Sequence, residues 1–311
     1  MIISASRRTD IPAFYSDWFY NRIKEGYVLV RNPMNIHQVS KIKLSPDVVD
    51  CIVFWTKNPQ PMIERLDEIS NYNYYFQFTL NSYFRDIEPN VPIKDSNIIP
   101  TFRKLSDKIG KERVIWRYDP IVISEKYDVD YHVKYFKKLA QLLDNKFEKC
   151  VISFVDIYKK NAKNLQLTGV SEPIRDDILA IAKAFSEISR EYGFQLNTCA
   201  EQADLTAFGI KHGKCIDDEL IERLCGCKIS VGKDKNQRDV CGCVESIDIG
   251  QYNTCPHKCK YCYANYSLKV VDNNYAKYDP ISPLLCSQLT PDDKITEKKV
   301  SSLIDTQTAM W

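Results

Sequence analysis

Hydrophobic runs of strand length alternate with longer amphipathic segments along most of the chain. The runs are rich in β-branched and aromatic residues, and several are almost continuously apolar, which is typical of parallel strands buried on both faces. This pattern predicts seven strands, at residues 1–6, 51–56, 74–80, 113–118, 150–155, 194–198 and 244–249. Apolar stripes at helical spacing predict helices between them, at residues 15–25, 62–70, 96–109, 129–143 and 172–192. Such alternation indicates an α/β fold with a parallel sheet, either open or closed into a (β/α) barrel of the TIM type.

Two segments depart from this alternation. Residues 27–44 predict a hairpin inserted after the first helix, with its turn near residues 32–35. From residue 272 the chain is polar and weakly patterned, so residues 272–311 are expected to form an extension packed on the surface. Residues 1–271 are then expected to form one barrel domain, which includes a cysteine-rich region at 199–262.

Polar residues end six of the predicted strands. They lie at residues 6–10, 55–58, 79–81, 116–119, 154–156 and 197–201. Because the carboxyl ends of parallel barrel strands converge on one face, these groups predict a shared polar cleft. Each group alone could also cap a helix, and Asp10, Asn58 and Asn81 suit that role.

Composition narrows the class of protein. Hydrophobic residues make up 44% of the chain, which excludes disorder, and the net charge of +2 argues against a strongly basic nucleic-acid binder. The start of the chain lacks an export signal, and no apolar run is long enough to cross a bilayer. We therefore expect a cytoplasmic protein, whose thiols stay reduced.

The twelve cysteines are unevenly distributed. Cys51 and Cys150 lie in apolar strand-like runs, where cysteine behaves as a small hydrophobe, and Cys286 stands alone. The other nine lie close together in the sequence: Cys199, Cys215, Cys225, Cys227, Cys241, Cys243, Cys255, Cys259 and Cys262. In a reducing compartment such clustering indicates metal binding.

The last three cysteines, Cys255, Cys259 and Cys262, have the spacing C-x₃-C-x₂-C. Three thiolates in one short loop can hold three irons of a [4Fe–4S] cluster and leave the fourth iron open for a small molecule. Structural zinc usually takes four ligands in two pairs, so the spacing suits zinc poorly, although a fourth cysteine from elsewhere could complete a zinc site. His257 is the other zinc candidate, but its crowded position predicts a side chain that faces solvent.

This loop resembles the signature of the radical S-adenosylmethionine superfamily, including the aromatic Tyr261 just before the third cysteine. The resemblance implies that the open iron binds the amino and carboxylate groups of S-adenosylmethionine. One-electron reduction would then split the sulfonium into methionine and a 5′-deoxyadenosyl radical, which takes hydrogen from a substrate. The resemblance also implies that Tyr261 packs beside the adenine.

The position of the loop differs from that superfamily, in which it usually follows the first strand. Here it follows the predicted strand at 244–249, near the end of the chain. A circular permutation explains the difference, with 244–249 as the usual first strand and residues 1–6 as the second. The whole chain also resembles a bacterial family known only as domain of unknown function 1848, on its start at residues 4–10, the stretch at 233–238 and the cysteine loop. That resemblance implies an architecture but no substrate.

Six cysteines of the clustered region remain. Cys199, Cys215, Cys241 and Cys243 are the preferred ligands of a second, auxiliary [4Fe–4S] cluster, because Cys199 follows a predicted strand and should face the cleft. Such auxiliary clusters occur in many radical enzymes of the superfamily that the chain resembles. The alternative is a zinc site made by two close pairs, Cys225 with Cys227 and Cys241 with Cys243. In the first case the remaining pair would be helix-end residues or substitute ligands.

Polar groups at strand ends are candidates for holding S-adenosylmethionine. The candidates are Lys57, Asn81, Arg117 and Asp119, for each of which an ordinary salt bridge or helix cap is the alternative. Arg7 and Asp10 belong to the densest charged cluster, which suits an anionic group of the substrate. Glu201, two residues after Cys199, could exchange protons or anchor the substrate.

The predicted function is therefore that of a radical S-adenosylmethionine enzyme acting on an unknown small-molecule or peptide substrate. Such an enzyme needs a one-electron donor such as flavodoxin or ferredoxin. One alternative is a zinc or iron–sulfur binding module without catalysis. Another is a nucleic-acid repair or modification enzyme, since residues 55–57 and 117–120 loosely resemble segments of photoproduct lyases. The even charge balance disfavours a duplex substrate, because phosphate contacts dominate such binding.

Overall fold

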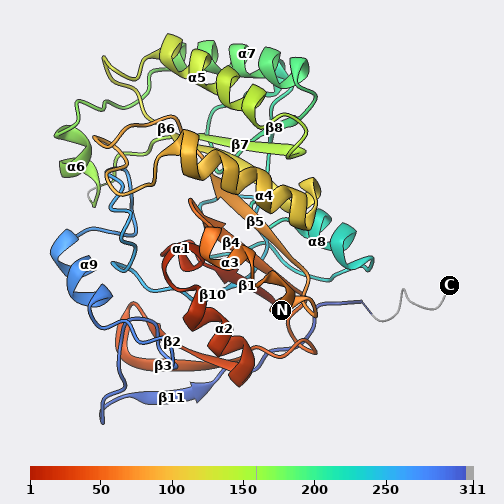
Figure 1. Cartoon of the computed structure of the whole chain (residues 1–311), viewed down its shortest axis with the longest axis vertical. Coiled ribbons are helices and arrows are strands. Elements are labelled where there is room, and N and C mark those ends of the chain that lie inside the picture. Colours follow the sequence, from red (N-terminus) through yellow and green to blue (C-terminus); the bar gives the residue numbers. More distant parts are fainter. Residues whose placement is uncertain (159, 306–311) are drawn as a thin grey trace.

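A sheet of eight parallel strands forms the centre of the chain in the computed structural model, which describes residues 1–158 and 160–305 (Figure 1). In spatial order the strands are β10 (Ile247–Asp248), β1 (Ile2–Ala5), β4 (Cys51–Thr56), β5 (Tyr74–Thr79), β6 (Val114–Ile121), β7 (Lys149–Phe154), β8 (Gln195–Thr198) and β9 (Lys211–His212). The predicted α/β fold is thus confirmed, and the sheet is consistent with a partial α/β barrel. The predicted strand at 244–249 is much shorter than expected, since only Ile247–Asp248 pair with β1.

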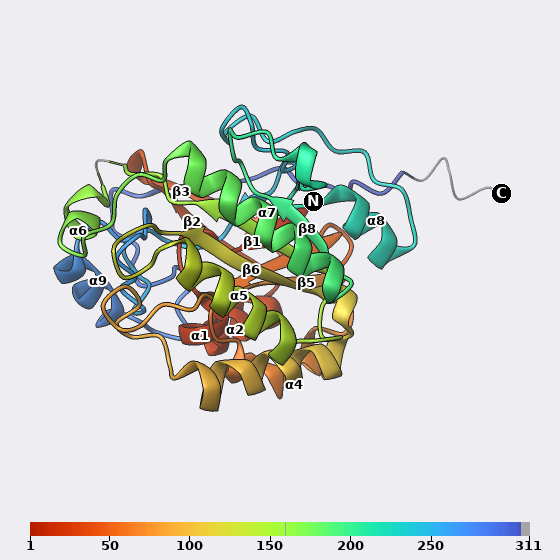
Figure 2. The same cartoon turned by 90° about the horizontal axis from the view of Figure 1, so that it is seen from above.

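Helices cover one face of this sheet. They are α2 (Ser16–Glu25), α4 (Ile99–Ile109), α5 (Val129–Leu142) and α7 (Arg175–Glu191). Phe54, Phe76 and Trp116 of successive strands belong to the same core as the apolar stripes of these helices. Figure 2 shows α7, α5 and α4 running side by side across the strands. The helices α4, α5 and α7 each connect one strand of the sheet to the next, as parallel pairing requires, whereas α2 leads into a separate hairpin.

The other face of the sheet is covered by residues 199–244, which include α8 (Asp218–Cys225). Since alternate strand residues point to opposite faces, Val53 and Tyr75 lie in a second core, together with Cys215 and Ile221. The Tyr75 hydroxyl donates a hydrogen bond to the Cys215 carbonyl at 2.7 Å. The cysteine-rich region therefore packs directly on the sheet.

The predicted hairpin is present as β2 (Tyr27–Asn32) and β3 (Asn35–Lys43), which pair antiparallel. Near the end of the chain, β11 (Lys294–Glu297) pairs with β3 in parallel. The helix α9 (Leu268–Tyr275) spans the expected boundary at residue 271, and the Ser267 side chain caps it by accepting from the Val270 N–H. The expected surface extension thus contains regular structure, and residues 306–311 of that prediction lie outside the described residues.

Three short helices complete the described part, α1 (Ile11–Phe14), α3 (Gln60–Ile63) and α6 (Ala162–Gln166). The helix predicted at 62–70 is divided into α3 and a 3₁₀ turn at Leu66–Ile69, because Arg65 between them has φ −108° and ψ 9°, outside the helical range. In the described residues, no helix combines the length and apolarity that a membrane crossing requires.

Candidate metal centre

The cysteine loop follows β10, which is an edge strand of the sheet. β10 pairs in parallel with β1 through Ile3–Ile247 and Ser4–Asp248. Hydrogen bonds close the loop on itself. The Asn253 N–H donates to the Ala264 carbonyl at 2.9 Å, and the Asn265 amide donates to the Cys255 carbonyl at 2.6 Å. The Cys262 N–H donates to the Cys259 carbonyl at 3.2 Å. The three thiols are thus carried by one compact turn.

Desolvation dominates the chemistry of these thiols. Cys259 is buried, whereas Cys255 and Cys262 are partly exposed. Burial raises the pKa of all three, and that of Cys259 reaches about 12 although the Lys57 ammonium opposes the shift. Without metal the three therefore stay protonated at neutral pH, and metal binding would release their protons.

Asp10 anchors the loop to the end of β1. Its Oδ2 accepts from His257 Nε2 at 3.0 Å and from the Lys57 N–H at 2.7 Å, while Oδ1 caps α1 through the Ala13 N–H at 3.0 Å. His257 is only 2% exposed, and its ring meets that of Phe14 edge-on. The prediction that His257 faces solvent was wrong, because a buried carboxylate far away in the sequence binds it.

Glu88 is a site residue that the sequence did not reveal. Its carboxylate is almost completely buried and accepts from Lys57 Nζ at 2.7 Å and from the Tyr261 hydroxyl at 2.5 Å. Lys94 Nζ lies 2.9 Å from the second oxygen. Burial alone raises the pKa of Glu88, but the two ammonium groups outweigh it and hold that pKa well below its ordinary value. The cysteine loop is therefore tied through Tyr261 to a buried ionic cluster.

The four predicted S-adenosylmethionine-binding residues lie in one hydrogen-bonded group. Asn81 donates to Glu88 and to the Tyr261 hydroxyl, both at 3.3 Å, and its Oδ1 accepts from the Asp119 N–H at 2.8 Å. The Asp119 carboxylate in turn accepts from Arg117 at 2.6 Å. Lys57 joins this group through Glu88. The ends of β4, β5 and β6 thus meet beside the cysteine loop, as expected for parallel strands.

Arg7 and Glu201 are held by the protein itself. The Arg7 guanidinium lies 3.5 Å from Asp234 and donates to the Ser246 hydroxyl at 3.1 Å. The Glu201 carboxylate accepts from the backbone N–H groups of residues 154, 202 and 203, at 3.2, 2.9 and 3.4 Å. These contacts fix the local backbone, so the predicted substrate roles of both residues stay predictions.

Four of the clustered cysteines come together on the face of the sheet that residues 199–244 cover, which we call the inner face. They are Cys199, Cys215, Cys241 and Cys243. The sulfurs of Cys199 and Cys215 are 3.0 Å apart, and the Cys243 sulfur accepts from the Cys215 N–H at 3.3 Å. Hydrogen bonds from neighbouring thiols lower the pKa of Cys199 and Cys243, whereas those of Cys215 and Cys241 are raised because their thiols donate. The four therefore behave as one coupled group.

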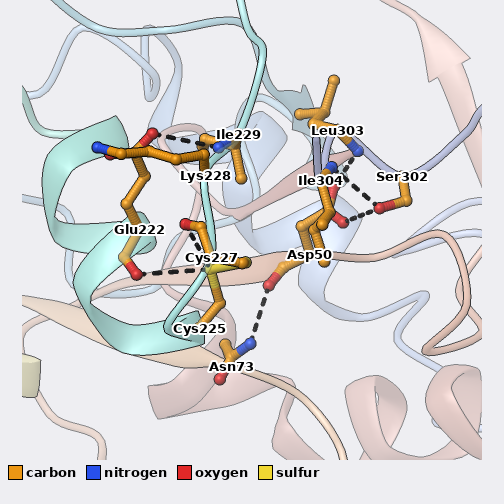
Figure 3. Close-up of a disulfide and its surroundings, with 10 residues drawn as sticks. All are labelled: Asp50, Asn73, Glu222, Cys225, Cys227, Lys228, Ile229, Ser302, Leu303 and Ile304. Carbon is orange, nitrogen blue, oxygen red and sulfur yellow. Dashed lines mark hydrogen bonds and ion pairs between the residues drawn. A yellow bond between two sulfur atoms is a disulfide. The ribbon is translucent and has the colours of Figure 1, made fainter. Parts of the chain in front are cut away.

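Cys225 and Cys227 are bonded to each other as a disulfide at the end of α8 (Figure 3). Residues near the end of the described chain lie beside them, since Ile229 and Ile304 form a β-bridge. The disulfide occupies both sulfurs, so in this state the pair supplies no thiolate to the alternative zinc site with Cys241 and Cys243.

Across residues 1–158 and 160–305, no three His, Cys, Asp or Glu side chains are arranged to enclose a single metal ion. The three thiols of the loop suit a group larger than one metal ion. Three cysteine sulfurs can ligate three irons of a [4Fe–4S] cluster and leave the fourth iron open. Two buried polar atoms at the loop, His257 Nδ1 and Asn265 Oδ1, have no hydrogen-bond partner among the described residues. By donor type and spacing, Cys255, Cys259 and Cys262 suit three irons of a [4Fe–4S] cluster.

Residues 2–264 match the family described as Domain of unknown function (DUF1848). The chain belongs to this family. The match includes both groups of clustered cysteines and the whole parallel sheet. A search of curated proteins found no match. The family description assigns no activity, so a function has to be argued from the residues.

Proposed function

We propose that the protein cleaves S-adenosylmethionine reductively at a [4Fe–4S] cluster held by Cys255, Cys259 and Cys262. The observation that carries this proposal is the position of the C-x₃-C-x₂-C loop, which follows β10 at the end of the sheet where parallel α/β proteins hold their ligands. When bound, the cluster would supply one electron to the sulfonium, releasing methionine and a 5′-deoxyadenosyl radical that removes a hydrogen atom from the substrate.

The order of the strands supports a circularly permuted barrel of the radical S-adenosylmethionine type. β10, late in the chain, lies at one end of the sheet beside β1, and the order then follows the sequence through β4, β5, β6, β7 and β8. If β10 is the first strand of the barrel, the cysteine loop follows the first strand, as in that superfamily. The permuted order accounts for a loop that comes late in the sequence.

The surrounding residues have distinct proposed roles. Glu88 and Asn81 hold the Tyr261 side chain in place, so that its ring can pack beside the adenine. Arg117 and Asp119 offer a charge-assisted pair for the polar groups of S-adenosylmethionine. Lys57 brings a positive charge toward Cys259, which favours the thiolate that binds iron. A flavodoxin or ferredoxin would supply the electron.

Electron paramagnetic resonance of the anaerobically reconstituted, dithionite-reduced protein tests this proposal. Because S-adenosylmethionine would ligate the open iron, its addition should change the spectrum of the reduced cluster. The Cys259→Ala variant should show no such change. Stoichiometric zinc in place of iron in the purified protein, or a wild-type spectrum indifferent to S-adenosylmethionine, would overturn the proposal and favour a binding module without catalysis.

A further inference from the structure

A second group of sulfurs lies inside the fold, apart from the cysteine loop. Cys215, Cys241 and Cys243 are between 1% and 5% exposed, and Cys199 is partly exposed. They come from three separate segments, after β8, after β9 and before β10. Burial alone is ordinary for cysteine, but four cysteines from distant parts of the sequence that meet in one place would be accounted for by a shared ligand.

The position of Cys215 is fixed from the strands beneath it. Its carbonyl accepts from the Tyr75 hydroxyl at 2.7 Å and from the Gln77 amide at 2.8 Å. Its sulfur accepts from Arg117 Nη1 at 2.7 Å. Side chains of two neighbouring strands therefore hold both the backbone and the sulfur of one cysteine, which is the kind of support that orients a metal ligand.

Hydrogen-bond donors and positive charge surround the sulfurs. The Cys243 sulfur accepts backbone N–H groups from residues 215 and 216 at 3.3 and 3.4 Å. The Trp55 ring lies 5.0 Å from the guanidinium carbon of Arg117 and 5.8 Å from that of Arg7. Within the described residues the buried Trp55 indole N–H has no hydrogen-bond partner. An anionic sulfur-rich group would be stabilised by the two backbone N–H groups and by the guanidinium of Arg117, which already donate to the sulfurs.

We propose that Cys199, Cys215, Cys241 and Cys243 bind a second [4Fe–4S] cluster on the inner face of the sheet, and that Arg117 raises its reduction potential. Four cysteines satisfy all four irons, so this cluster would transfer electrons without binding substrate. Cys199 and Cys215 must rotate apart to do so, because 3.0 Å is closer than two sulfurs stand on any shared metal group. Zinc ligands usually come in two close pairs, and among these four cysteines only Cys241 and Cys243 are close in sequence.

Arg117 connects this group with the cysteine loop. One of its nitrogens binds the Cys215 sulfur and the other binds Asp119, whose N–H is held by Asn81 beside Tyr261. A positive charge and a hydrogen bond at a cluster sulfur favour the reduced, more negative state. The guanidinium can therefore raise the reduction potential of the second cluster. At the same time it pairs with the Asp119 carboxylate, which lies near the cysteine loop.

Iron analysis of a variant without the first site tests the proposed cluster. The wild-type protein should take up about eight irons per chain and the triple variant Cys255→Ala/Cys259→Ala/Cys262→Ala about four, since each cluster holds four. Adding Cys215→Ala and Cys243→Ala to that variant should remove the remaining iron, whereas adding Cys225→Ser and Cys227→Ser should not. A folded triple variant, checked by circular dichroism, that binds no iron, or binds zinc in its place, would overturn the proposal.

A redox titration of the triple variant tests the role of Arg117. Arg117→Met should lower the ratio of reduced to oxidised cluster at a fixed potential about tenfold, equal to about 59 mV for one electron. Arg117→Lys should recover most of that change, because it keeps the charge. An unchanged potential in a folded Arg117→Met variant would refute the tuning role. The iron content and reduction potential that decide this proposal are measured on variants without the first site, so their outcome does not depend on S-adenosylmethionine cleavage.

Discussion

The two groups of cysteines differ in how the chain assembles them. Cys255, Cys259 and Cys262 lie within eight consecutive residues, and burial raises the pKa of each thiol. The inner group is drawn from residues spread over 199–243, and its thiols hydrogen-bond to one another. A local loop leaves one face of its metal open, whereas a group enclosed by the fold saturates it. In the proposed account, the first group activates the substrate and the second stores an electron.

Replacing Cys259 separates the two groups most sharply. Cys259→Ala should abolish 5′-deoxyadenosine formation and remove about four of about eight irons, because only the loop loses a ligand. Product analysis by liquid chromatography and iron analysis measure both effects. Cys150→Ala is the matched control, since Cys150 is buried in β7 within the core that the helices cover, whereas Cys215, Cys241 and Cys243 lie in the core on the other face, and the variant should keep product and iron. Loss of all iron in Cys259→Ala would mean that the two groups form one site.

Removing the charge of Glu88 tests how the loop is held. Glu88→Gln leaves Lys57 and Lys94 without their buried partner, and should lower the free energy of unfolding by about 3–5 kcal/mol. Urea denaturation measures this change. Glu64→Gln is the control, because the Glu64 pair with Lys104 is exposed, and it should change the stability by less than about 1 kcal/mol. Equal effects of the two variants would refute the anchoring role of Glu88.

The same carboxylate predicts a pH dependence. Its pKa is lower in the folded chain than the ordinary value of 4.5, so the stability it contributes is fully present above that value. As the pH falls below about 4.5 towards the lower folded pKa, protonation of the unfolded state removes that contribution. Wild-type stability, measured by urea unfolding from pH 6 to about pH 3, should thus fall more steeply than that of Glu88→Gln. Parallel curves would contradict a depressed pKa.

A smaller effect is expected at Asp10. In Asp10→Asn the remaining oxygen can still cap α1. The amide NH₂ then takes the place of the oxygen that accepts from two donors, the Lys57 N–H and His257 Nε2. Leaving these donors unpaired should cost about 1–3 kcal/mol in urea unfolding. Asp128→Asn is the control at an exposed cap of α5, where the amide oxygen can replace the carboxylate. A similar change in both variants would show that His257 does not depend on Asp10.

The smallest effect is expected at the disulfide. Cys225→Ser/Cys227→Ser should leave the iron content unchanged and lower the free energy of unfolding by at most about 2 kcal/mol, because the closed loop is very short. Metal analysis and urea unfolding measure this. Loss of metal from the double variant would instead support the alternative site with Cys241 and Cys243.

The sequence predicted most of the sheet, because near-continuous apolar runs mark buried parallel strands. It predicted β10 too long, at 244–249, and missed β9 (Lys211–His212), since strands of two residues are too short to show a pattern. The cysteine loop could be predicted because its spacing is local. Glu88 was missed because Arg85 and Asp86 beside it are exposed, so the segment has the polarity of an ordinary surface loop. The partner of His257, Asp10, is 247 residues away, and only the folded chain brings them together.

The most direct test of the proposed function is a single-turnover assay of the anaerobically reconstituted protein, reduced with dithionite and mixed with S-adenosylmethionine. We predict methionine and 5′-deoxyadenosine in equal amounts, approaching one of each per reduced loop cluster, with the radical taking its hydrogen atom from the buffer or the protein because no substrate is added. Protein that carries full iron on Cys255, Cys259 and Cys262, is reduced, and yields neither product would contradict the proposal.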